Sequence, residues 1–340
     1  MKLNNLTRIA LGLLLAVLTS CAVHEWPSPE DVVPFRIKFS ILNIEWEMMD
    51  RACGDDISDT RGSNPAKLRY TIRLVPVTKM MTDKQVTQEF VMLKELDDDT
   101  DLEISADVPP GTYDVLVWAD YVREGSGVPY YNIDNFAAIT YNGTYEGNND
   151  YHDAFRGVAR IELIADIMDN APDELSIYMQ RPFAKFELIT NDIDAFITSE
   201  ISRKGLPAGS QIDLSEYSVV YQYVGFYPDT YNMFTDKPVD ASSGVSFTSS
   251  ITKIDDSTAT LGFDYVFVGD SESIVTVQVG VYDKDGVEVS RTESIKVPLN
   301  RSQHSLVHGD FLMSTASGGV NVDSSYNGDH NIVIQRRLGK

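Results

Sequence analysis

Two histidines stand four positions apart, His304 and His308, and on a helix this spacing would aim both imidazoles at one zinc ion. The residues around them, Ser305-Leu306-Val307 and Gly309, instead favour a strand or a turn. In a strand of about 3.3 Å per residue the two side chains would lie roughly 13 Å apart, which is too far to share one metal. We therefore expect no zinc site here.

A run dominated by aspartate, Asp97–Asp101, offers carboxylate oxygens of the kind that Ca²⁺ prefers. It lacks the glycine and the terminal glutamate of an EF-hand loop, so a solvated turn is favoured. The sequence also holds no nucleophile elbow, zinc-protease, P-loop or dinucleotide-binding signature. A hydrolase with paired carboxylates stays open as a less favoured alternative, but no such pair stands out. We expect a protein that is not an enzyme and binds no cofactor.

Cys21 is the residue with the best-defined chemistry. Residues 1–20 combine two basic side chains with a short apolar run, Ile9 to Leu18, as in a cleavable secretory signal. That run is shorter than the roughly 20 apolar residues of a membrane-spanning helix. The ending Leu18-Thr19-Ser20-Cys21 resembles the bacterial lipobox, which implies acylation of the Cys21 thiol and anchoring to the outer membrane by lipid. The alternative is an ordinary cysteine at a generic cleavage site.

The charge balance argues against nucleic acid as a partner. The chain has 28 basic and 51 acidic residues, a formal charge of −23. The signal peptide holds two of the basic residues and none of the acidic ones, so the exported part carries 26 against 51, or −25. Such a surface repels polyphosphate. If Cys21 is lipidated, Cys53 is the only remaining thiol, and no disulfide can form within the chain.

The elements that would position these residues are short strands. Phe35–Phe39 and Tyr70–Leu74 alternate apolar and polar residues, as half-buried strands do. Repeated strands separated by turn residues predict an all-β protein. After a linker over 21–34, we expect two β-sandwich domains, at 35–181 and 182–340. The other predicted strands are Val86–Leu93, Tyr113–Tyr121, Val158–Ile164, Leu175–Met179, Phe183–Ile189, Val219–Phe226, Thr258–Val268, Ile274–Val281, Val287–Val297 and Ser305–Met313.

One segment near the start of the second domain has helical spacing instead. Ile193, Phe196, Ile197 and Ile201 would share one face of a helix. The segment is preceded by Asn191-Asp192 and followed by Lys204-Gly205. The pattern predicts a short amphipathic helix with an N-cap and a glycine C-cap.

Two segments carry a resemblance to a known family. In Val108–Asp120 a Pro-Pro-Gly-Thr-Tyr turn leads into an apolar strand that ends in Trp-Ala-Asp, and Val297–Leu312 combines a hydrophilic turn with Gly-Asp-Phe-Leu. Both segments resemble the fimbrillin-like lipoproteins of type V pili. The resemblance implies two transthyretin-like sandwiches and a role in a fimbria that supports adhesion, with other fimbrial subunits as partners. The opening Cys21–Pro27 looks more like the anchor and accessory group than like the stalk subunit.

The resemblance also implies assembly by strand addition. In such pili an early strand can be removed by cleavage after an arginine, and a strand of the neighbouring subunit fills the groove. Here Phe35–Trp46 would be the removable strand, and Arg51 and Arg61 lie in the polar loop that follows. The alternative is that both arginines are ordinary solvated surface residues.

The C-terminal segment His330–Arg337 follows an Asn-Gly turn signal and has two interpretations. It is either a strand donated to a neighbour or the last strand of its own sandwich, and the second is favoured because terminal strands usually pair within their domain.

A region rich in tyrosine and asparagine suggests a different function. Aromatic and amide side chains on a loop form a reasonable contact surface for a glycan or a host protein. The alternative function is therefore a monomeric surface lipoprotein that binds such a ligand through residues 130–151, and the alternative structure is a loop packed on the sandwich. The tyrosines in question are Tyr130, Tyr131, Tyr141, Tyr145 and Tyr151.

Overall fold

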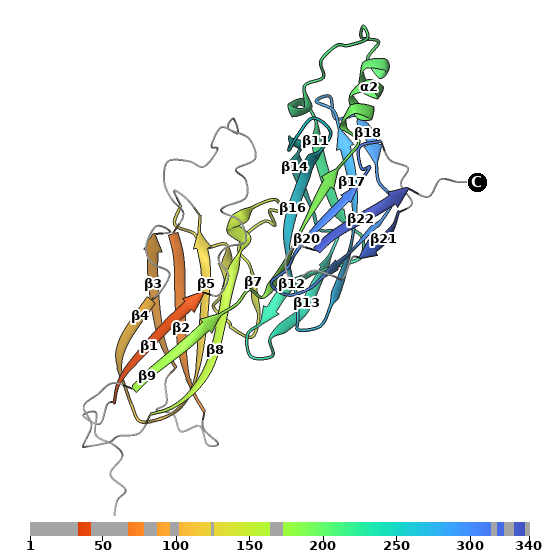
Figure 1. Ribbon diagram of the computed structural model, residues 1–340. Coiled ribbons are helices and arrows are strands. Elements are labelled where there is room, and N and C mark those ends of the chain that lie inside the picture. Colours follow the sequence, from red (N-terminus) through yellow and green to blue (C-terminus); the bar gives the residue numbers. More distant parts are fainter. Residues whose placement is uncertain are drawn as a thin grey trace, which may run out of the picture.

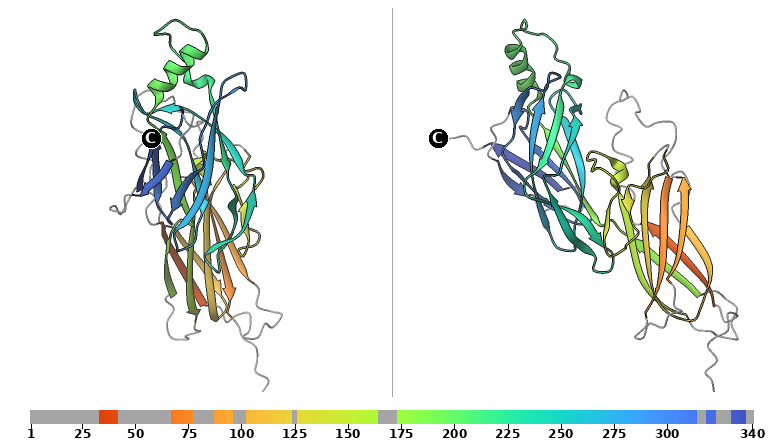
Figure 2. Two further views of the ribbon diagram at one scale, coloured as in Figure 1. Left: turned by 90° about the vertical axis from the view of Figure 1, so that its right-hand side faces the viewer. Right: turned by 180° about the vertical axis from the view of Figure 1, so that it is seen from behind.

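The computed structural model describes residues 33–41, 67–77, 87–95, 102–123, 126–163, 173–313, 318–322 and 330–336. Two β-sandwiches lie end to end and give the molecule an elongated shape (Figure 1), which Figure 2 shows from two further sides. The all-β fold with a short helix near the start of the second sandwich is as predicted. Cys21, Cys53, Arg51, Arg61 and Asp97–Asp101 lie outside the described residues.

The first sandwich pairs a four-stranded with a three-stranded sheet. The orders are β3-β2-β5-β8 and β4-β1-β9. The inward side chains, such as Ile72, Val115 and Val117, are fully buried between the two sheets. The strands are β1 (Val33–Ile41), β2 (Lys67–Pro76), β3 (Gln88–Glu95), β4 (Leu102–Val108), β5 (Gly111–Val122), β8 (Ala154–Leu163) and β9 (Asp173–Met179).

The second sandwich packs a six-stranded sheet, β15-β16-β10-β20-β22-β21, on a five-stranded one, β14-β11-β17-β18 with β19 also paired to β17. Phe186, Tyr221 and Val277 are among the side chains buried between them. The strands are β10 (Phe183–Thr190), β11 (Ser218–Tyr223), β14 (Ser246–Ser250), β15 (Thr252–Lys253), β16 (Ala259–Phe267), β17 (Ser273–Tyr282), β18 (Glu288–Arg291), β19 (Ile295–Leu299), β20 (His304–Gly309), β21 (Gly318–Val322) and β22 (His330–Arg336).

A third, smaller sheet lies where the two sandwiches meet. Its order is β13-β12-β7-β6, with β6 at Tyr131–Asn132, β7 at Ile139–Tyr141, β12 at Phe226–Asn232 and β13 at Lys237–Ser243. β12 and β13 continue the β11 and β14 pair as a long hairpin that reaches toward the first sandwich (Figure 1). This hairpin therefore ties the two halves of the molecule together.

Helix α2 (Ile193–Arg203) confirms the predicted helix and its glycine C-cap. Gly205 has φ +65°, and the amides of Gly205 and Leu206 donate to the carbonyls of Ser202 and Ile201, as in a Schellman motif. The helix stands at the end of the second sandwich that is remote from the first (Figure 1). Single 3₁₀ turns occupy Asp150–His152 and Leu214–Glu216. In the described part of the chain, no helix is long and apolar enough to cross a membrane.

Two predicted strands are each divided in the structure. Val219–Phe226 breaks at Gly225, whose φ of +104° separates β11 from β12. Val287–Val297 breaks at Thr292, because its hydroxyl replaces a backbone partner by accepting a hydrogen bond from the Val279 amide at 2.9 Å. Both segments have strand-like sequence on either side of the break. Hydrophobic alternation alone therefore does not reveal the break.

Candidate functional site

Strand β1 occupies a slot between two other strands of the first sandwich. It pairs antiparallel with β4 and parallel with β9, so that Ile37 lies opposite Ile104 on one side and Leu175 on the other. A strand in this position satisfies the backbone hydrogen-bonding groups of both neighbours. Without it, β4 and β9 would each present an unpaired edge.

The inner face of β1 supplies three large side chains to the core. Phe35, Ile37 and Phe39 are each 1% exposed. The ring of Phe39 stacks on Tyr70 of the facing sheet, with centroids 6.1 Å apart. The space that β1 fills between β4 and β9 is therefore an apolar groove that accepts every second side chain of the strand.

The outer face of β1 is polar. Lys38 is exposed, and the Arg36 guanidinium lies 2.7 Å from the Glu103 carboxylate on β4. This alternation matches the amphipathic pattern expected from Phe35–Phe39. The predicted Phe35–Trp46 strand begins as β1, and its part beyond Ile41 lies outside the described residues.

The proposed cleavage residues fall in the connection between β1 and β2. Arg51 and Arg61 belong to residues 42–66, which lie outside the described part of the chain. Because both positions follow β1 and precede β2, a cut after either would separate β1 from the rest of the polypeptide. Their assignment as cleavage sites stays a prediction.

The tyrosine-rich region is packed into the junction between the sandwiches. Tyr130 and Tyr131 are buried, and Tyr141, Tyr145 and Tyr151 are half-buried. Tyr131 lies among aromatic rings of both halves, including Trp118 at 5.6 Å and Phe183 at 5.8 Å between centroids. The structure therefore favours packing over a contact surface for these rings, because they supply the apolar area that joins the two sandwiches.

A buried carboxylate lies beside this aromatic cluster. Asp264 is 1% exposed and accepts hydrogen bonds from the hydroxyls of Tyr145 and Tyr223 and from the Tyr265 amide. Burial raises the pKa of Asp264 to about 7, and the three donors only partly oppose this rise. Tyr145 belongs to the segment that leaves the first sandwich, whereas Asp264 lies on β16, so this contact also joins the two halves.

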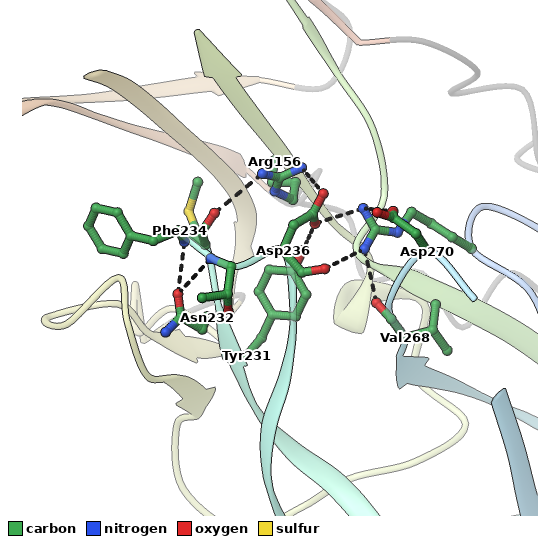
Figure 3. Close-up of polar contacts among 10 residues, drawn as sticks. Arg156, Tyr231, Asn232, Phe234, Asp236, Val268 and Asp270 are labelled. Carbon is green, nitrogen blue, oxygen red and sulfur yellow. Dashed lines mark hydrogen bonds and ion pairs between the residues drawn. The ribbon is translucent and has the colours of Figure 1, made fainter. Parts of the chain in front are cut away.

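A second carboxylate, Asp236, bridges the halves by ion pairs. It lies at the tip of the β12–β13 hairpin, where one oxygen is 2.7 Å from Arg156 of β8 and the other is 2.7 Å from Arg301, which precedes β20 (Figure 3). Arg156 also donates to the Met233 carbonyl, and the Tyr231 hydroxyl donates to Asp236. The sequence does not predict this cluster, because its members are far apart along the chain and share no local spacing.

A third ion pair lies at Arg181, at the predicted domain boundary. The Arg181 guanidinium is 2.8 Å from the Asp153 carboxylate, and both side chains are buried. Burial raises the pKa of Asp153 while the neighbouring guanidinium opposes this rise. The connection between β9 and β10 is thus stabilised by an ion pair as well as by packing.

The two histidines and the C-terminal strand lie on the six-stranded sheet. His304 and His308 are on β20, opposite Lys185 and Ile189 of β10. His304 lies 3.4 Å from the Glu187 carboxylate, and the described residues contain no group of three or more metal-binding side chains. β22 pairs parallel with β20 and antiparallel with β21, so the C-terminal strand lies in its own sandwich.

Comparisons with known proteins give one family match. A family of unknown function (DUF6562) matches residues 34–335. No curated protein matches this sequence.

Several solved structures share the general arrangement. They include a candidate adhesin from Bacteroides ovatus (10% identity, 76% of this chain and 77% of that chain, TM-score 0.40) and a candidate cell adhesion protein from Bacteroides eggerthii (11%, 89% and 95%, 0.38). The fimbrial anchor protein Mfa2 from Porphyromonas gingivalis is another (12%, 76% and 81%, 0.36). At these TM-scores the similarities assign no role to this chain.

Proposed function

The chain belongs to this family of unknown function (DUF6562), and from that premise we propose that it is an anchor or accessory subunit of a fimbria. In this proposal a lipid on Cys21 holds it at the outer membrane on the cell surface. It joins other subunits by strand complementation and supports adhesion. The motivating sequence features are the lipobox-like ending before Cys21 and the two fimbrillin-like segments, Val108–Asp120 and Val297–Leu312.

The observation that carries the proposal is the position of β1. Its inner side chains Phe35, Ile37 and Phe39 fill a groove whose two walls, β4 and β9, would otherwise have open edges. Strand addition needs both features: free backbone groups for affinity and pockets for alternate side chains for specificity. In an anchor or accessory subunit β1 itself fills this groove, whereas in a subunit that has lost β1 a neighbour's strand with the same alternation could take its place.

An anchor or accessory subunit differs from a stalk subunit in what it keeps. It would retain both the lipid and β1, whereas a stalk subunit would lose β1 by a cut after Arg51 or Arg61. The pairing of β22 within its own sandwich supports a subunit that does not donate this strand to a neighbour. In a subunit that keeps β1, the arginines act as ordinary surface residues.

The alternative of a monomeric binding protein that uses residues 130–151 receives less support. Tyr130 and Tyr131 are 7% and 1% exposed, so they offer little ring surface to a glycan or a host protein. Their packing instead contributes to the junction that holds the two sandwiches in line.

Crosslinking on living cells tests the fimbrial proposal. Cells that produce the full-length protein are treated with a lysine-reactive crosslinker, and the crosslinked peptides are identified by mass spectrometry. We expect covalent links between this chain and another fimbrial subunit. If crosslinks form within the chain but never to a pilin-like neighbour, the fimbrial role is wrong.

A further inference from the structure

Strand β13 forms a free edge on the second half of the molecule. It ends the sheet β13-β12-β7-β6 and pairs only with β12 among the described strands. Six of its positions are exposed and Pro238 is half-buried. The backbone N–H and C=O groups that face away from β12 thus meet solvent, and such a row is a template for an added strand.

The first part of β13 carries residues that usually protect edge strands, Lys237, Pro238 and Asp240, but its second part, from Ala241 to Ser243, does not. From Ala241 to Thr252 the sequence contains no charged residue, although 23% of the whole chain is charged. Edge strands of the first sandwich carry charged residues along their length, which discourages pairing with another chain. These residues are Glu89 on β3, Glu103 and Asp107 on β4, and Arg160 and Glu162 on β8.

An uncovered aromatic ring lies next to the same edge. Phe226 on β12 is 77% exposed, the highest value for a large apolar side chain among the described residues. Its partner across the ladder is Ser243 of β13, which is too small to cover the ring. An apolar side chain opposite Ser243 on an added strand would lie on the Phe226 side of the sheet and remove this apolar surface from water.

A second copy of this chain fits the edge poorly. In a two-fold antiparallel arrangement the longest overlap would place Lys237 opposite Ser243 and Asp240 opposite Asp240, and like charges directly opposite each other are unfavourable. The exported chain also carries a formal charge of −25, from 26 basic and 51 acidic residues, so two copies repel. A different polypeptide with a basic residue opposite Asp240 has neither problem.

We propose that β13 is a docking edge for an extended segment of a different polypeptide, with a basic residue opposite Asp240 and an apolar residue beside Phe226. The added strand would extend the sheet of the second half of the molecule. This inference goes beyond the proposed function, because it does not depend on the β1 groove of the first sandwich. In an anchor that keeps β1 in its groove, the β13 edge is a separate contact site.

Amide hydrogen exchange on the full-length protein tests this proposal. Exchange of peptides that cover 237–243 is compared between the purified protein and the protein on intact cells. The edge variant combines Ala241→Lys with Ser243→Lys, and the matched control combines Ala208→Lys with Ser202→Lys at exposed positions in and after α2. Exchange of peptides from β11 and β16 reports whether each variant is folded. If the double edge variant does not fold, the single variant Ser243→Lys is used in its place.

We expect the outward-facing amides of β13 to exchange at least about tenfold more slowly on cells than in the purified protein. The edge variant should lose this protection, and the control variant should keep it. Equal exchange on cells and in solution would overturn the proposal, as would protection that persists in the edge variant. Protection that appears in the purified protein as its concentration rises would overturn it too, by showing that a second copy is the occupant. Peptides from 33–41 report on the β1 groove separately.

Discussion

The guanidinium of Arg156, on the last strand of the four-stranded sheet of the first sandwich, lies 2.7 Å from the carboxylate of Asp236 at the tip of a hairpin from the second. The same carboxylate receives Arg301 from the second sandwich. Both arginine side chains are 9% exposed and the Asp236 side chain is 25% exposed, so this contact joins the halves at a partly buried place. The Asp236 ion pairs and the aromatic cluster around Tyr131 together join the two sandwiches.

Replacing Asp236 should weaken the junction. Asp236→Ala leaves Arg156 and Arg301 without their shared partner, and breaking a buried pair from one side costs on the order of 3 kcal/mol. Urea unfolding measures this loss, and small-angle scattering should show a wider range of molecular shapes. Asp240→Ala, at an exposed position of the same hairpin, is the control. Equal stability of the two variants would show that the bridge does not hold the halves together.

Truncating the inner face of β1 should destabilise the first sandwich. Phe35→Ala removes a fully buried ring, and such changes cost about 3–5 kcal/mol. The matched change Lys38→Ala on the outer face should alter the free energy of unfolding by no more than about 0.5 kcal/mol. Denaturant titration distinguishes the two. Similar small effects from both would mean that β1 does not contribute to the core.

Replacing Tyr131 should affect stability whether or not a ligand is present. Tyr131→Ala removes a ring packed against Trp118 and Phe183, and a loss of about 3–5 kcal/mol is expected. A thermal melt of the purified protein measures it. Thr144→Ala, at an exposed position of the same segment, provides the control. An unchanged melting temperature for Tyr131→Ala would restore the contact-surface interpretation.

The buried Asp264 predicts a pH-dependent stability. Burial raises the pKa of Asp264 from 3.8 to about 7, so between these values the folded protein holds a proton that the unfolded chain releases. The contribution of Asp264 to stability is therefore fully present below about pH 4 and is lost as the pH rises through about 7.

Asp264→Asn checks this sign. The difference in free energy of unfolding between the original protein and the variant should shift in favour of the original as the pH falls from about 8 to about 5. Denaturant titrations at both pH values measure it, with Asp256→Asn in an exposed turn as the control. A difference that is constant across this range would show that Asp264 stays ionised in the folded protein.

The parts of the fold that sequence predicts well are those where one face of an element is buried. Phe35–Phe39 and Ile274–Val281 appear in β1 and β17, because alternation records which side chains face the core. The sequence pattern does not predict β13 or β14, since a strand that is exposed on both faces, or built largely from Ser and Thr, has little hydrophobic alternation. β4 is not among the predicted strands either, although Ile104 and Val108 are buried and Ser105 and Asp107 between them are exposed.

Local capping was predicted only in part. Asp192 precedes α2 as expected, but its side chain makes no capping hydrogen bond. Its carboxylate instead accepts hydrogen bonds from the amides of Leu312 and Met313, which lie far from Asp192 along the chain. These contacts also explain why the predicted strand Ser305–Met313 ends at Gly309. Tertiary partners replaced the local one.

The candidate site shows the same limit. The amphipathic pattern of Phe35–Phe39 predicted a half-buried first strand, and β1 is that strand. Its parallel partner β9 begins at Asp173, far along the chain, and no residue spacing predicts such a pairing. The Asp236 bridge escaped prediction for the same reason. The domain bounds of 35–181 and 182–340 stay a prediction.

The mass and N-terminus of the protein isolated from its native outer membrane test the central claim most directly. Intact-protein mass spectrometry should give a chain that begins at a lipidated, blocked Cys21 and still contains β1, as an anchor or accessory subunit requires. A free N-terminus at Ala52 or Gly62 would contradict this account. It would show that the chain is cut after Arg51 or Arg61, that β1 is lost, and that the protein is a polymerising subunit.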